Sequence, residues 1–165
     1  MRTDFGTLGG TLDPHAAFLI LRGLKTYFVR YKAQCESAMR VAEHLAAHPA
    51  VAKVHYPGLP THPQHGLAKA QMKEFGTIVT FDLKGGAEAG GKFAGALKLF
   101  ALAASLGSTE SLVVAPQMMR GRDLTQDQLR TSAVTEGTVR MSIGLEDVDD
   151  LMEDISQALA ASSPP

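Results

Sequence analysis

The chain has 165 residues, of which 45% are hydrophobic and 20% charged, and its net charge is −1. This length suits one domain that buries roughly 70% of the surface of the unfolded chain, and the composition excludes a protein that is mainly disordered. Sixteen basic residues against seventeen acidic ones argue against a nucleic-acid partner, and no apolar run is long enough for a membrane span. A single cysteine, Cys35, excludes an internal disulfide. The start resembles no signal peptide, so a cytoplasmic setting is expected.

The first third of the chain predicts an arm followed by helices. Residues 1–12 are rich in glycine and lack a helical period, so they are expected to form an N-terminal arm or linker. Asp13 and Pro14 favour a helix start, and helical sequence runs to residue 48 with a break at Gly23 and Thr26, where Thr26 is a second candidate cap. Beyond that break one apolar stripe is predicted, consisting of Phe28, Tyr31, Cys35, Ala38, Ala42 and Leu45. Cys35 is therefore expected in the core and not as a nucleophile.

The remaining sequence predicts short strands and helices in alternation. The expected elements are a strand over 52–56, a helix over 64–72, a strand over 77–83, a helix over 88–97, extended pieces over 100–106 and 111–114, a helix over 124–132 capped by Asp123, a strand over 138–143, a helix over 146–161 and a tail over 162–165. We expect an α+β fold, in which helices cover one face of a small, mostly antiparallel sheet.

Two segments are candidates for anion binding. The loop over 105–111 contains small and hydroxylated residues that leave backbone amides accessible, although a plain polar loop between strands explains it as well. In the strand over 138–143, alternation places Arg140 and Ser142 on one face. A buried arginine needs an anion, and its planar fork suits a carboxylate. The alternative is a salt bridge to a nearby acid, for which the candidates are Glu110, Glu136 and Glu146.

Other catalytic patterns are weak or missing. His62 and His65 are spaced to share a helix face, but no carboxylate or cysteine nearby completes a ligand set, so a structural pair is favoured and no metal is expected. The sequence contains no nucleophile elbow, no Walker loop and no dinucleotide fingerprint.

Several motifs together resemble one enzyme family. They are Gly9-Gly10 before Pro14, Arg22-Gly23-Leu24-Lys25-Thr26, Tyr56-Pro57-Gly58-Leu59-Pro60, His62-Pro63-Gln64-His65, Phe75-Gly76, Ser105-Leu106-Gly107 with Glu110-Ser111-Leu112, and Val139-Arg140-Met141-Ser142-Ile143-Gly144-Leu145-Glu146-Asp147. In this order they are similar to the C-terminal domain of the pyridoxal-phosphate-dependent trans-sulfuration enzymes, such as cystathionine γ-synthase, cystathionine γ-lyase and methionine γ-lyase. The resemblance implies the small C-terminal domain of a fold-type I enzyme over residues 13–161.

The resemblance also implies a substrate site. The family's serine and arginine that hold the substrate α-carboxylate match Ser105 and Arg140. Ala104 matches the residue that faces the substrate side chain, and Leu106 and Met119 would line the same pocket. Arg120 replaces a family threonine, and we expect it to meet an anionic leaving group such as phosphate or succinate. Asp123-Leu124-Thr125-Gln126 resembles the cystathionine γ-synthase branch.

The family's cofactor-binding lysine has no counterpart here. None of the eight lysines, Lys25 included, lies in the Ser-x-Thr-Lys setting that would form the Schiff base. We therefore expect no catalytic residue in this chain, no pyridoxal phosphate bound to it alone, and a piece or truncated form of a longer enzyme. The expected partners are an amino-acid substrate, the missing cofactor domain or a paralogue, and a second copy in a homo-oligomer. A non-catalytic assembly module is the alternative.

Overall fold

The computed structural model describes residues 12–115 and 134–162. Its elements are α2 (Pro14–Leu24), α3 (Tyr27–Ala47), β1 (Val51–His55), α4 (His65–Gln71), β2 (Ile78–Leu83), α5 (Gly86–Ala96), β3 (Ala101–Leu102), β4 (Leu112–Val114), β5 (Thr138–Ser142) and α8 (Val148–Ser162). The expected helix over 124–132 with its cap Asp123, and most of the expected N-terminal arm, lie outside the described residues.

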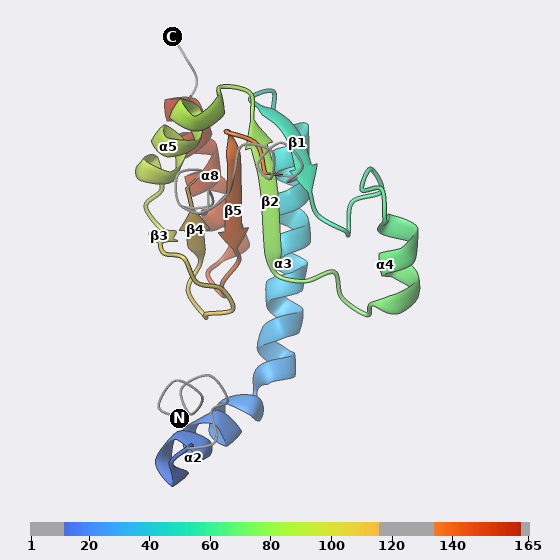
Figure 1. The fold of residues 1–165 in the computed structure, drawn as a ribbon, viewed down its shortest axis with the longest axis vertical. Helices are drawn as coiled ribbons and strands as arrows, with labels where there is room; N and C mark the ends of the chain where they lie inside the picture. Colours follow the sequence, from blue (N-terminus) through green and yellow to red (C-terminus); the bar gives the residue numbers. More distant parts are fainter. Residues whose placement is uncertain (1–11, 116–133, 163–165) are drawn as a thin grey trace, which may run out of the picture.

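The strands form one sheet in the order β1-β2-β5-β4-β3. Three of the neighbouring pairs are antiparallel, and only β3 and β4 run parallel. Helices α3, α5 and α8 lie on one face of this sheet (Figure 1). The expected α+β architecture is therefore confirmed, and β5 occupies the centre of the sheet.

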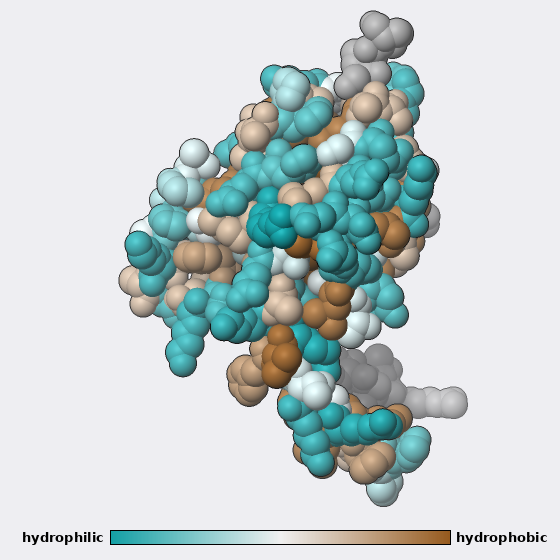
Figure 2. Space-filling view, turned by 180° about the vertical axis from the view of Figure 1, so that it is seen from behind, coloured by the Kyte–Doolittle hydropathy of each residue, from teal (hydrophilic) through white to brown (hydrophobic). Residues whose placement is uncertain are grey.

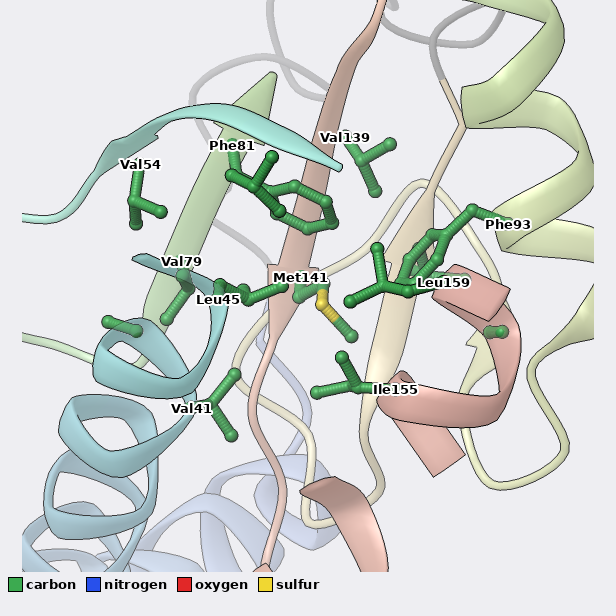
Figure 3. Close-up of a cluster of buried hydrophobic side chains, with 14 of the residues drawn as sticks. Val41, Leu45, Val54, Val79, Phe81, Phe93, Val139, Met141, Ile155 and Leu159 are labelled. Carbon is green, nitrogen blue, oxygen red and sulfur yellow. The ribbon is translucent and has the colours of Figure 1, made fainter. Parts of the chain in front are cut away.

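The core lies between the sheet and these three helices. Alternate residues of the two central strands point into it, and Val79, Phe81, Val139 and Met141 have no exposed surface. They meet side chains of α3, α5 and α8 (Figure 3). Phe93 of α5 contacts Phe81 edge to face, with ring centroids 5.4 Å apart. The intervening residues of β5 therefore point away from the core. We call the face of the sheet opposite to these three helices the second face.

Both helices at the start of the chain begin at the predicted cap residues, but only the first cap makes side-chain hydrogen bonds. Asp13 caps α2, because its Oδ1 accepts hydrogen bonds from the amides of His15 (2.9 Å) and Ala16 (3.2 Å). Thr26 occupies the N-cap position of α3, as predicted, but its side chain makes no cap hydrogen bond. The hydroxyl donates to the Gly23 carbonyl instead.

The apolar stripe of α3 is buried only in part. Cys35 and the residues beyond it are buried, as predicted, whereas Phe28 is 80% exposed. The first turns of α3 extend past the body of the domain toward α2 (Figure 1), where no element of the sheet can cover them. The periodicity of the sequence predicted the apolar face of the helix but not the residue at which the rest of the domain stops burying it.

Three predicted boundaries shift for identifiable reasons. Helix α4 begins at His65, not at 64, since the His62 Nδ1 accepts the Gln64 amide and holds the turn before it. The strand expected over 100–106 shrinks to two residues because only Ala101 and Leu102 pair with β4. Helix α8 begins at Val148, after Glu146 has turned its carboxylate toward Ser111.

Candidate functional site

The candidate site lies on the second face of the sheet, where β5 presents its polar residues. Arg140 is paired in register with Thr80 of β2 and Val114 of β4, so it stands at the middle of the sheet. The alternation predicted for this strand is confirmed, because Val139 and Met141 are in the core while Arg140 points away from it. The backbone at Arg140 is therefore held by hydrogen-bonded strands on both sides, β2 and β4.

The Arg140 guanidinium has a free donor in a partly buried position. Its Nη2 donates to the Ser105 carbonyl oxygen at 3.0 Å. Its Nε is buried and has no hydrogen-bond partner among the described residues. A buried charged donor without an acceptor is costly, so the geometry favours an anion at this place.

Two of the three acids considered as salt-bridge partners of Arg140 are engaged elsewhere. The Glu110 carboxylate accepts a hydrogen bond from the Ser108 hydroxyl, which lowers the Glu110 pKa. The Glu146 carboxylate accepts from the amide and the hydroxyl of Ser111, at 2.7 and 2.8 Å. Both acids thus bind the loop after Ser105.

The structure brings the predicted loop residues close to this arginine. Ala104, Ser105 and Leu106 are exposed and follow the short strand β3. Gly107 then turns the chain with φ of +76°, a backbone conformation that residues with a side chain rarely adopt. Ser105 and Arg140 are therefore brought together, whereas Met119 and Arg120 lie outside the described residues.

The lysines and the cysteine differ in their exposure to solvent. All eight lysines are exposed, so none is enclosed beside Arg140 as a Schiff-base lysine would be. Burial raises the pKa of the Cys35 thiol, which suits its place in the core and not a nucleophile.

Both histidines of the predicted pair make local contacts, and His62 Nδ1 accepts a hydrogen bond from the Gln64 amide. The ring of His65 lies 5.6 Å from that of Phe75, and its Nδ1 lies 2.9 Å from the Pro57 carbonyl oxygen. The described residues hold no group of three potential metal ligands. No helix in the described ranges is long and apolar enough to cross a membrane.

Sequence reasoning missed a second polar cluster, which shares the second face with Arg140. Asp82 is only 7% exposed, and its carboxylate lies 2.7 Å from His55 Nε2. It also accepts hydrogen bonds from the hydroxyls of Thr138 (2.5 Å) and Thr135 (2.9 Å). The available clue was an acid inside the apolar strand over 77–83, which implies a paired buried charge.

Comparison with known proteins identifies the family. Residues 3–160 match the family described as Cys/Met metabolism PLP-dependent enzyme, and the chain belongs to this family. It is 45% identical over 151 residues to an L-methionine gamma-lyase of Fusobacterium nucleatum, covering 92% of this chain and 38% of that protein. It is 47% identical over 154 residues to the chloroplastic cystathionine gamma-synthase 1 of Arabidopsis thaliana, covering 93% of this chain and 27% of that protein.

A solved structure supports the same relationship. The cystathionine gamma-lyase of Micromonospora echinospora superposes with a TM-score of 0.86 at 41% identity, covering 96% of this chain and 42% of that one. The chain therefore spans less than half the length of these relatives. These comparisons establish its fold and its family. They do not show that this chain has the activity of its longer relatives.

Proposed function

We propose that this chain is the substrate-binding part of a pyridoxal-phosphate-dependent trans-sulfuration enzyme and holds the α-carboxylate of the amino-acid substrate. The supporting observation is the buried, unpaired Nε of Arg140 beside the Ser105 turn. A carboxylate there would accept from Nε and leave Nη2 on the Ser105 carbonyl. The reactions concerned are β- or γ-elimination, or γ-replacement, on amino acids derived from homoserine or cysteine.

The chain's own residues would bind and orient, and would move no proton. Arg140 fixes the carboxylate end of the substrate, and the Ser105 hydroxyl adds a second contact. Ala104 is small and uncharged, so the substrate side chain would meet no acid at that position. Pyridoxal phosphate, when bound by the rest of an intact enzyme, supplies the electron sink. This chain alone is proposed to be inactive.

The test is a titration with L-methionine, followed by NMR signals of the Ser105–Gly107 amides and of Arg140 Nε. L-Methioninol, which lacks the carboxylate, is the matched ligand. We expect L-methionine to shift these signals and L-methioninol to leave them in place. Arg140→Gln should abolish the shift, because it removes the charge and the fork.

The control variant is Arg40→Gln, which removes an exposed arginine that pairs with Asp149 away from the site. It should bind L-methionine as the wild type does. Equal shifts with both ligands, or undiminished binding by Arg140→Gln, would contradict the proposal.

Helix α2 supports a second candidate function, assembly with another copy of this chain. Four consecutive residues, Phe18 to Leu21, are between 48% and 62% exposed, and the helix has no buried residue. Consecutive apolar residues occupy every side of a helix, and helices of this kind are normally buried. Figure 2 shows hydrophobic residues at the surface of the narrow neck that leads to this helix.

Light scattering on the purified chain tests this candidate. We expect a concentration-dependent dimer, which Leu19→Lys combined with Leu21→Lys should convert to a monomer. Leu67→Lys on α4 changes a leucine of similar exposure and should leave the dimer intact. A wild-type monomer at all concentrations would rule this function out.

A further inference from the structure

The turn over residues 105–108 carries half of the proposed carboxylate site but has little packing of its own. Residues 104–107 are exposed, and the segment lies between strands β3 and β4 without regular structure. Its contact with Arg140 is one hydrogen bond to the Ser105 carbonyl. A segment of this kind samples many conformations unless other contacts hold it.

Ser142 supplies one such contact from the strand that carries Arg140. It lies two residues further along β5, so its side chain points to the same face as the guanidinium. Its Oγ accepts a hydrogen bond from the Gly107 amide at 3.1 Å, and the residue is 2% exposed. One face of β5 therefore binds the turn twice, at Ser105 and at Gly107.

Gln34, which lies on helix α3, supplies a second contact to the turn. Its side chain is 6% exposed, and Nε2 donates both of its hydrogens, to the Ser108 carbonyl at 2.8 Å and to the Ile143 carbonyl at 2.9 Å. The same amide thus ties the turn to the end of β5. Because both acceptors are backbone atoms, the contact fixes the path of the chain.

The far end of the loop has an anchor of its own. Ser111 is fully buried, accepts a hydrogen bond from the Gly144 amide, and is bound by the Glu146 carboxylate. Loss of the Ser142 contact should therefore free residues 105–108 while the strands around them stay folded.

We propose that Ser142 and Gln34 are positioning residues, which hold the 105–108 turn against Arg140 so that the two halves of the carboxylate site keep their spacing. The effect on substrate binding rests on the proposed function, but the effect on the turn does not. Ser142 acts through the Gly107 amide, and Gln34 acts through the Ser108 carbonyl.

The test compares Ser142→Ala with Ser142→Thr, which keeps the hydroxyl. Amide hydrogen exchange at Gly107, the Arg140 side-chain NMR signals and the dissociation constant for L-methionine are the readouts. For Ser142→Ala we expect exchange at Gly107 to be about three- to tenfold faster and binding to be weaker by a similar factor, as for loss of one hydrogen bond. Ser142→Thr should restore both.

Two more variants separate positioning from general stability. Ser162→Ala removes a buried hydroxyl that donates to the Leu159 carbonyl within α8, and it should change neither readout. Gln34→Met keeps the size of the side chain but removes the donor to the Ser108 carbonyl, and it should therefore also make exchange at Gly107 faster. Unchanged exchange at Gly107 in Ser142→Ala, or faster exchange with unchanged affinity, would overturn the proposal.

Failure of the proposed function would look different. In that case the wild type would bind no L-methionine, or Arg140→Gln would bind it normally. Exchange at Gly107 and the Arg140 side-chain signals would then still decide whether Ser142 holds the turn.

Discussion

At the scale of single residues, Asp82 shows how a buried charge is accommodated beside the candidate site. Burial raises the pKa of its carboxyl, but hydrogen bonds from Thr138, His55 and Thr135 outweigh this effect and hold the pKa below its ordinary value. Thr135 and Thr138 form the turn that enters β5, so the charge also fixes the start of the strand that carries Arg140.

The lowered pKa predicts a loss of stability in acid. A carboxyl with a lower pKa in the folded state than in the unfolded state stabilises the fold above its unfolded pKa. That contribution is lost as the pH falls from about 4 through the folded pKa. Asp82→Asn should therefore flatten the fall of the unfolding free energy below pH 4, measured by urea denaturation.

Asp150→Asn is the control for this prediction, since Asp150 is an exposed acid in the first turn of α8. Its unfolding free energy should follow the wild-type pH dependence. A wild-type slope in Asp82→Asn would show that the cluster does not stabilise the fold through its charge.

At the scale of elements, α8 holds the segment that leads into β3. Asp154 is 5% exposed, and its carboxylate accepts hydrogen bonds from the amides of Lys98 and Leu99, at 2.9 to 3.1 Å. Gln157 on the same helix donates to Asp154 and to the Ala96 carbonyl. The end of α5 and the start of β3 are thus attached to one helix face, upstream of the Ser105 turn.

Asp154→Ala should lower the unfolding free energy by about 2–3 kcal/mol, because two backbone amides lose a charged acceptor. Chemical denaturation measures this loss. Glu153→Ala changes an exposed neighbour on α8 and should cost less than about 0.5 kcal/mol. Equal losses in the two variants would mean that the Asp154 contacts do not hold the segment.

At the scale of the whole molecule, the chain combines the partly buried Arg140 with eight lysines that are all exposed. The Arg140 Nε is buried and has no hydrogen-bond partner among the described residues. Relatives of known function are more than twice as long. The proposed inactivity of this chain alone can therefore be tested with the cofactor itself.

Pyridoxal phosphate added to the purified chain should dialyse away, leaving neither a cofactor absorbance band nor a stoichiometric borohydride-trapped adduct. Lysine side chains in water react with the aldehyde weakly and reversibly, and all eight lysines of this chain are exposed. Lys25→Arg should give the same spectrum as the wild type. A retained adduct at one specific lysine would contradict the proposed inactivity.

Local pattern in the sequence determined much of this protein. The alternation of β5, the cap of α2 and the burial of Cys35 were all readable, because each depends on neighbours along the chain. The family was readable from motifs spread over the chain. Together these features predicted Arg140 and Ser105 as the candidate site residues.

Only the tertiary structure decided which polar groups meet. Gln34 binds carbonyls 74 and 109 residues away, and Asp82 binds a hydroxyl 56 residues away. Contacts across such separations leave no periodic trace in a sequence, since their geometry depends on how the helices pack on the sheet. For the same reason, the apolar stripe of α3 did not reveal that Phe28 lies beyond the edge of the core.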